Sequence, residues 1–175
     1  MLIALILASA AAAPGTWTVD SAQSALRYAV NHKLHKVDAT SKEAEGKAVV
    51  RPDGTLMVEV RAPVASFKSG DGNRDEHMLE VMNVGAHPFV VFKGLGHLAH
   101  GDAQLQLQGQ IELHGVKAPA PVSLSLEAQP DGSLRVKGSF DVSLDAHGIE
   151  RPSLLFAKVD DACRIEVDLL LRGPK

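Results

Sequence analysis

The chain has 175 residues, of which 45% are hydrophobic and 22% charged, the size and composition of one globular domain with its own core. The net charge is −3 and only 4% of the residues are aromatic. Nucleic-acid-binding surfaces need a basic field and stacking rings, so the composition disfavours them and we expect no nucleic-acid partner. The single cysteine, Cys163, excludes an intramolecular disulfide.

The N-terminus carries an apolar run at residues 2–7, followed by small residues that include Ala8-Ser9-Ala10. This order is typical of a secretory signal peptide, and we expect residues 1–13 to be removed, which leaves a domain of residues 14–175. The run is too short to cross a bilayer, which needs about 20 apolar residues. No lysine or arginine follows Met1, so an apolar N-terminal strand is the alternative. Export without disulfides indicates a periplasmic location, or else a secreted protein.

Beyond this segment, apolar and polar residues alternate with a period of two, the pattern of β-strands with one buried face. Pro-Asp-Gly turn sequences separate several of these runs. Such strands favour antiparallel pairing, and eight of them can close into a barrel. The interior of an eight-stranded barrel is either filled by its own side chains or holds one elongated ligand. In chain order, the predicted strands cover residues 24–32, 37–50, 55–61, 89–98, 104–115, 121–128, 134–144 and 161–171.

The most polar stretch of the chain, GDGNRDEHML, interrupts the strands and has the features of a short helix. Asn73 is a favoured N-cap residue, and Glu76 completes a capping-box pattern three positions later. An apolar stripe follows on one side of this helix and consists of Met78, Leu79 and Met82. The predicted fold class is therefore all-β, an eight-stranded antiparallel barrel with one short helical insertion at about residues 74–83.

The same stretch concentrates acids and an imidazole, which raises the question of catalysis. Adjacent helix positions point about 100° apart, so Asp75, Glu76 and His77 do not converge on one substrate. Cys163 falls on the apolar face of its strand and is interpreted as a core residue. We therefore expect no catalytic residue, and a protein that is not an enzyme.

Eight histidines raise the question of a metal site. The pairs His32/His35 and His97/His100 are each three positions apart, so on a strand their members would face opposite sides and would not chelate one ion. We expect no metal and no cofactor. His32 shares the inward face of its strand, where it is either a hydrogen-bonded core histidine or a polar group near the head of a ligand.

Four stretches carry a resemblance to a known family. WTVDSAQSALRYAVNH has the alternating apolar residues that end in histidine, although Gln23 stands where the family has histidine. VASFKSGDGNRDEHM, from Val64 to Met78, is similar to the most recognisable segment of that family, and HPFVVFKG and GQIELHGVKAPAPVSL resemble its later strands. VDATSKEAEG replaces the usual Val-x-Gly-x-Phe after the first strand. From about Thr16 to the C-terminus, the chain resembles the YceI-like family of periplasmic, lipocalin-like proteins.

The resemblance implies a lipocalin-like barrel that carries a long apolar molecule in its interior, such as a polyisoprenoid, an isoprenoid quinone or a fatty amide. Each buried methylene contributes about 0.8 kcal/mol and a head-group hydrogen bond about 1 kcal/mol, so a long tail would dominate the affinity. The expected partner is this lipid, with a transient contact to a membrane or membrane protein. The oligomeric state is left open, a dimer included. The alternatives are a ligand-free structural or stress-response barrel and an enzyme that modifies a lipid.

Strand parity and helix facing predict which side chains meet the ligand. His32 and Arg74 are expected near polar groups, and the others against the tail. Gly109 and Gly138, on inward faces, are expected to let the tail run close to the backbone. The predicted ligand-binding residues are Leu26, Tyr28, Val30, His32, Phe67, Arg74, Met78, Leu79, Met82, Phe89, Val91, Ile111, Val136 and Phe140.

Overall fold

The computed structural model describes residues 12–34, 36–154 and 157–174, so the predicted signal peptide lies almost wholly outside the described residues. Within these ranges, no helix is long and apolar enough to cross a membrane. The helices are α1 (Gly72–Val81) and the short 3-10 turns η1 (Ser21–Gln23), η2 (Val64–Ser66) and η3 (Asp145–His147). The strands are β1 (Gly15–Val19), β2 (Ala25–Asn31), β3 (Lys36–Ser41), β4 (Glu45–Val50), β5 (Thr55–Pro63), β6 (Phe89–His97), β7 (Gln104–Leu113), β8 (Val116–Pro119), β9 (Val122–Ala128), β10 (Leu134–Ser143), β11 (Ser153–Leu154), β12 (Ala157–Lys158) and β13 (Ala162–Arg172).

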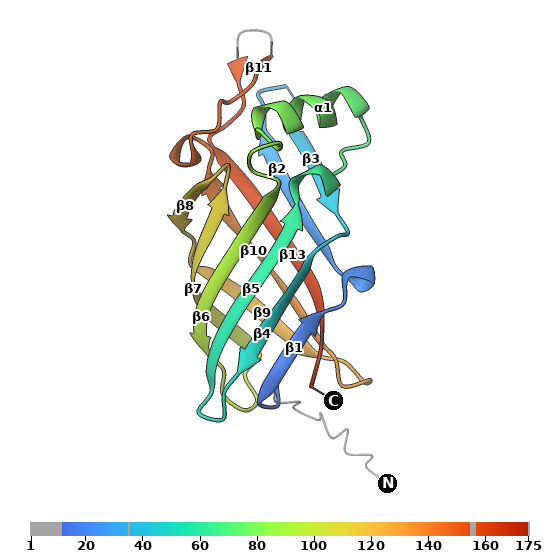
Figure 1. Ribbon diagram of the computed structural model, residues 1–175, viewed down its shortest axis with the longest axis vertical. Coiled ribbons are helices and arrows are strands. Elements are labelled where there is room, and N and C mark those ends of the chain that lie inside the picture. The colour runs from blue at the N-terminus through green and yellow to red at the C-terminus, as the bar shows by residue number, and fades with distance from the viewer. Residues whose placement is uncertain (1–11, 35, 155–156, 175) are drawn as a thin grey trace.

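The strands form one closed antiparallel barrel, whose axis is vertical in Figure 1. Its hydrogen-bonded order is β1, β4, β5, β6, β7, β9, β10 and β13, and the ring closes where Thr18 and Val19 of β1 pair with Arg172 and Leu171 of β13. Toward the end that carries α1, here called the upper end, β2 and β3 continue β1 and β4, and β8 continues β9. The predicted eight-stranded antiparallel barrel is confirmed.

The strand predicted over residues 37–50 is wrong in one respect, because the chain bends between β3 and β4. Ser41 is fully buried at the bend, and its Oγ accepts a hydrogen bond from the Glu43 amide at 3.1 Å. The Ser41 and Ser66 hydroxyls lie 2.6 Å apart. A short polar side chain that bonds local backbone competes with the strand ladder, which period-two reasoning does not register.

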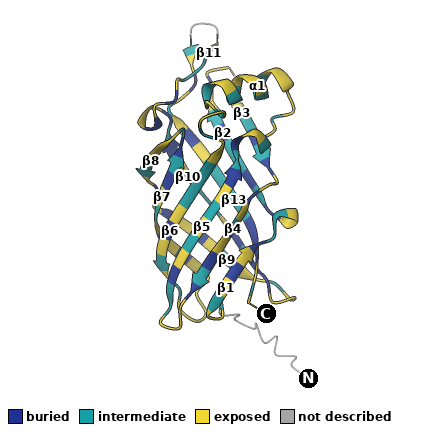
Figure 2. Cartoon of the chain, in the orientation of Figure 1, coloured by how far each residue is buried: buried dark blue, intermediate teal, exposed yellow. Residues whose placement is uncertain are grey.

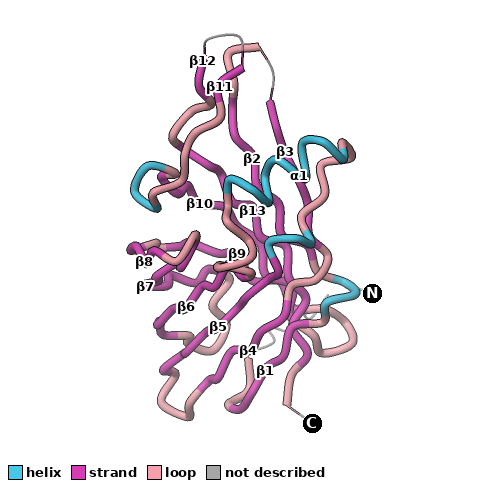
Figure 3. Tube along the Cα trace, turned by 45° about the horizontal axis from the view of Figure 1, so that its top comes forward, coloured by secondary structure: helices cyan, strands magenta, loops and turns pink. Residues whose placement is uncertain are grey.

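A strap, residues 64–71, crosses from the end of β5 to the start of α1. Thr40 of β3 and Lys68 of the strap exchange two backbone hydrogen bonds of 3.0 Å each. Ser66 also donates to the Pro63 carbonyl at 2.6 Å. These bonds hold the strap against the C-terminal end of β3. Figure 3 shows α1 at the same end of the barrel as the tops of β2 and β3, and β11 and β12 also lie there.

The helix begins two residues earlier than predicted, at Gly72, and Asn73 is not its cap. The backbone of Asp71 is extended, and its carboxylate accepts a hydrogen bond from the Arg74 amide at 3.1 Å, so Asp71 is the N-cap. Aspartate and asparagine cap equally well, so both Asp71 and Asn73 are chemically suitable, and the structure uses Asp71. The predicted capping box with Glu76 is therefore wrong.

The lower part of the barrel is packed around Trp17 and is joined on its outer side by ion pairs. Trp17 is buried, and its indole nitrogen donates to the Ala13 carbonyl at 2.9 Å. Outside the barrel wall, Arg172 of β13 pairs with Asp20 after β1 and with Asp131 in the turn between β9 and β10. Buried and exposed residues alternate along the strands, as the dark blue and yellow segments in Figure 2 show. The core predicted from strand parity thus lies inside the barrel.

Candidate ligand-binding cavity

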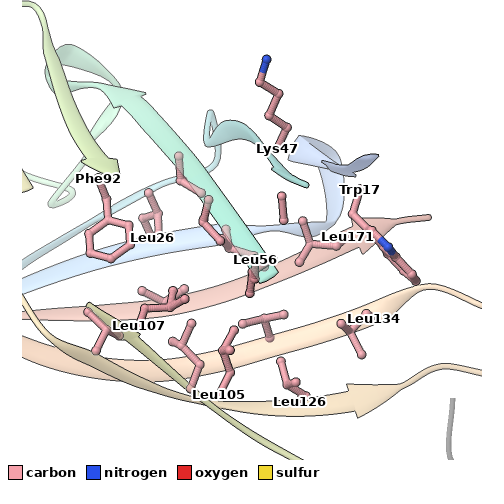
Figure 4. A pocket seen from close by; sticks show the side chains of 18 of the residues that line it. Trp17, Leu26, Lys47, Leu56, Phe92, Leu105, Leu107, Leu126, Leu134 and Leu171 are labelled. Atoms are coloured by element: carbon pink, nitrogen blue, oxygen red, sulfur yellow. The ribbon is translucent and has the colours of Figure 1, made fainter. Parts of the chain in front are cut away.

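The interior of the barrel contains a small cavity in its lower half, here called the lower cavity, with a volume of about 130 Å³. Figure 4 shows Phe92 at one end of it and Trp17 at the other, with leucines from several strands between them. Lys47 also borders it, but its amine points away from the apolar side chains. The cavity is comparable to one that holds a molecule as small as benzene, so the lower half of the barrel is nearly filled by its own side chains.

A larger cavity, here called the upper cavity, lies beneath α1 and has a volume of about 540 Å³. Most of its wall is apolar, and its polar groups come from the strap, α1, Tyr28 and Ser153. Small-molecule sites in proteins have volumes of about 300–1,000 Å³ with mostly apolar walls. The lining residues are Tyr28, Val30, Val37, Val64, Phe67, Asp71, Asn73, Arg74, His77, Met78, Val81, Met82, Val90, Leu113, Leu144, Ile149, Pro152, Ser153, Val159, Cys163 and Ile165.

Four aromatic rings, here called the aromatic waist, lie between the two cavities. The ring centres of Tyr28 and Phe67 are 5.6 Å apart, and those of Phe92 and Phe140 are 6.1 Å apart. Tyr28 borders the upper cavity, Phe92 and Phe140 border the lower one, and Phe67 borders both. Val90 and Ile165 border both cavities as well, so these residues and the four rings together form the boundary between the cavities.

The two inward glycines make room for side chains rather than for a ligand. A Cβ atom on Gly109 would lie 2.3 Å from the Phe92 ring, and one on Gly138 would lie 2.6 Å from the Ser123 carbonyl oxygen and 2.7 Å from Leu124. The prediction that a tail runs along these glycines is wrong, because neighbouring protein atoms occupy that space.

Ten of the fourteen predicted residues line one or both cavities. The upper cavity takes six of them and the lower cavity five, with Phe67 shared. Contact with a ligand remains a prediction for all of them. The ten are Leu26, Tyr28, Val30, Phe67, Arg74, Met78, Met82, Ile111, Val136 and Phe140.

The prediction that Phe89 and Val91 face the interior is wrong. Phe89 is 36% exposed, and the Arg61 guanidinium lies 4.8 Å from its ring centre. Val91 is paired with Arg61 and is likewise outside, whereas Val90 and Phe92 line the cavities. The run FVVF is apolar at every position, so alternation does not determine its register.

Two further predicted residues lie elsewhere. His32 is buried in the upper wall, with Nε2 3.0 Å from the Ala157 carbonyl oxygen and Nδ1 accepting from the Leu34 amide at 3.3 Å, so it is a hydrogen-bonded core histidine. Leu79 lines neither cavity, and Val81 takes its place in the stripe. Positions 78, 81 and 82 share a helix face because residues three and four apart are neighbours, whereas position 79 is turned about 100° away from 78.

Several lining residues were missed by sequence reasoning. Gly94 could have shown which side of β6 faces inward. It is buried, and it lies on the same side of the strand as Val90 and Phe92. Gly94 of β6 is paired with Gly109 of β7, and paired residues point to the same side of the sheet. The inward-facing positions of β7 therefore identify those of β6. Ile165 lines both cavities, and its position there depends on the long-range register of β13 with β2 and β10.

The acids next to the upper cavity have structural partners. Asp71 caps α1 and also lies 3.8 Å from the Arg74 guanidinium. Asp75 accepts hydrogen bonds from the Ser69 hydroxyl at 2.6 Å and the Ser69 amide at 3.0 Å, and these bonds lower the pKa of the Asp75 carboxyl. The two carboxylates therefore fasten α1 to the strap.

Two ionisable groups in the upper cavity are held neutral by burial. Loss of solvent raises the pKa of the Tyr28 phenol to about 12 and that of the Cys163 thiol to about 12. In the unfolded chain these groups lose their protons nearer their ordinary pKa values of 10.0 and 9.0. The stability that the neutral forms contribute is thus complete below about pH 9 and is lost as the pH rises toward 12.

The raised pKa predicts an unreactive thiol. At pH 8 we expect Cys163 of the folded protein to react with an aromatic disulfide reagent at least about a hundredfold more slowly than in the urea-unfolded chain, because the thiolate fraction is about a thousandfold smaller. The rate of absorbance change measures this, and it should keep rising between about pH 9 and 11. Equal rates for the folded and unfolded protein at pH 8 would show that the thiol is not buried as described.

A closed eight-stranded antiparallel barrel with an apolar interior and a helix at one end defines the lipocalin-like class of folds. The family model of the YceI-like domain matches residues 17–171. The chain therefore belongs to the YceI-like family, as its motifs indicate, and no curated protein matches it.

Solved structures share the fold at low sequence identity. A polyisoprenoid-binding domain from Saccharophagus degradans, implicated in plant cell wall breakdown, has a TM-score of 0.73 at 12% identity, over 90% of this chain and 98% of that one. BcnA of Burkholderia cenocepacia has a TM-score of 0.74 at 16% identity, over 87% and 98% of the two chains. The YCEI protein of Campylobacter jejuni has a TM-score of 0.62 at 12% identity, over 77% and 83%.

Proposed function

We propose that this protein is an exported, non-enzymatic carrier that holds a long-chain lipid, namely a polyisoprenoid, an isoprenoid quinone or a fatty amide, inside its barrel. The observation that carries the proposal is the upper cavity, whose volume of about 540 Å³ and largely apolar wall suit an apolar ligand. Membership of the YceI-like family, and the polyisoprenoid-binding domain among the similar structures, point the same way.

The lipid would fill the upper cavity first. Each methylene that leaves water for this wall contributes about 0.8 kcal/mol, so affinity grows with the length that fits. The lower cavity, at about 130 Å³, has room for the end of a tail only. A self-filled structural barrel would resemble the lower half throughout, and the size of the upper cavity favours the carrier instead.

The upper end also suits a transient contact with a membrane, from which a lipid could be loaded. Leu34, in the loop between β2 and β3, is 66% exposed and is flanked by the exposed cations Lys33 and Lys36. An exposed apolar side chain between positive charges matches an anionic lipid surface, where the apolar group inserts and the cations pair with head groups.

The proposal is tested by the lipid content of the protein. After export in a bacterial host and purification without detergent, we expect native mass spectrometry to show an added mass of one lipid per chain, which organic extraction then releases for identification. A protein that carries no lipid, and that takes up none from vesicles of a bacterial lipid extract, would contradict the carrier function.

A further inference from the structure

The residues just before β1 take part in the floor of the barrel. Ala12 lines the lower cavity and packs against the buried core, although β1 begins only at Gly15. The Ala13 carbonyl accepts a hydrogen bond of 2.9 Å from the indole nitrogen of Trp17, whose side chain is buried. By their contacts, these two alanines belong to the folded domain.

The ring of Trp17 is held from both ends of the chain. A Cβ atom on Gly173 would lie 3.1 Å from this ring, so the ring packs closely against the C-terminal backbone. Among the described residues, the Ala13 carbonyl is the only acceptor for the indole N–H. A buried indole N–H needs such a partner, so loss of Ala13 would leave a polar group of the floor unpaired.

The signal peptide that the sequence predicts could end at several bonds. Its cleavage site is marked by small residues in an A-x-A pattern. Every position from Ala8 to Ala13 is alanine or serine, so this pattern precedes the bonds after residues 10, 11, 12 and 13. The pattern of small residues alone does not choose among these four cuts.

The floor of the barrel does choose among them. A cut after residue 12 or 13 would remove Ala12 from the wall of the lower cavity, and a cut after residue 13 would also remove the acceptor of the Trp17 N–H. A cut after residue 11 would leave a charged amino group on Ala12, in a mostly apolar wall where an unpaired charge is costly. The cut after Ala10 keeps both alanines and places the new charge one residue before this wall.

We propose that signal peptidase cuts between Ala10 and Ala11, and that Ala12 and Ala13 stay in the mature protein as part of the floor of the barrel. Hydrolysis of this peptide bond consumes one water, leaves a carboxylate on Ala10 of the released leader and frees the amino group of Ala11. The inference rests on the export in the proposed function. It places the mature domain at residues 11–175 instead of 14–175.

The mass of the protein exported in a bacterial host tests the cut. In denaturing mass spectrometry, which removes any lipid, we expect the mass of residues 11–175. A chain that begins at Ala12, Ala13 or Pro14 would overturn the assigned cut and leave the carrier function standing, because native mass spectrometry of the same sample reports the lipid separately. A protein that keeps residues 1–10 would overturn the cut and the export together.

The role of the two alanines is tested without export, in leaderless chains that begin at Ala11 or at Gly15. Urea unfolding is followed by far-ultraviolet circular dichroism. We expect the shorter chain to unfold at a urea concentration lower by about 0.5 M, the shift that one lost hydrogen bond produces.

Trp17→Phe in both lengths is the control, because it keeps an aromatic ring and removes the N–H that Ala13 accepts. In this background the shortening should shift the midpoint by less than about half as much. An equal shift in both backgrounds, or no shift with Trp17 in place, would overturn the assignment of Ala13 to the floor.

Discussion

Val30→Trp is expected to abolish lipid retention without unfolding the barrel. Val30 is on β2, is half-buried and points into the upper cavity, where its cross-strand neighbours Val37 and Cys163 also line the wall. An indole in this place would displace about four methylene groups of a lipid tail. The binding free energy would then weaken by about 3 kcal/mol, which is about a hundredfold in affinity. Because it enters existing space, the free energy of unfolding should change by less than about 1.5 kcal/mol.

The matched control is Asn31→Trp, one position along the same strand. Asn31 is exposed on the outer face, so the added indole there does not enter the cavity. Native mass spectrometry should show one lipid per chain for Asn31→Trp and none for Val30→Trp, with the same far-ultraviolet circular dichroism for both. A Val30→Trp protein that still carries its lipid would place the ligand elsewhere and refute the upper cavity as its site.

Leu107→Ala is expected to have the largest effect on stability. Leu107 is 1% exposed in the filled lower half, and its Cδ2 lies 2.9 Å from where a Cβ on Gly96 would stand. Removing three carbon atoms there leaves a void in tightly packed surroundings, which costs about 3–4 kcal/mol in the free energy of unfolding. Urea unfolding of the lipid-free protein, followed by the fluorescence of Trp17, measures the loss.

Met82→Ala provides the contrast. Met82 is only half-buried and lines the upper cavity, which already has free volume, so its truncation should cost about 1 kcal/mol. The difference between the two variants separates the part of the barrel that provides stability from the part that provides space. Equal costs would mean that the upper half is packed as tightly as the lower half.

Much of this architecture could be predicted because most strands bury one face only. On β7 and β9, for example, the alternation of leucine or valine with glutamine or serine determines the inward side without knowledge of the neighbouring strands. β6 lacks such a contrast, and its side chains could be placed only through the pairing of Gly94 with Gly109. Fold and family were therefore accessible from local patterns, whereas the inward side of an all-apolar strand was not.

The candidate site was less accessible, because a cavity is a difference between the volume of the barrel and the volume of its side chains. Phe92 occupies the space over Gly109, so a glycine that looked like room for a ligand holds a ring instead. His32 bonds the carbonyl of Ala157, far away in the sequence, and only the folded chain brings the two together. Asp71 and Asn73 are nearly equivalent caps. Which of them caps the helix depends on backbone angles that cannot be predicted from the residue types.

The seam between β1 and β13 has a consequence for the order of events during biosynthesis. It joins Thr18 to Arg172, near the two extremes of the chain, and the same final strand also pairs with β2 and β10. The ring therefore cannot close until β13 has been synthesised, and contacts of such long sequence separation form slowly. A polypeptide of this topology therefore keeps its barrel open until its final strand is available to pair with the first.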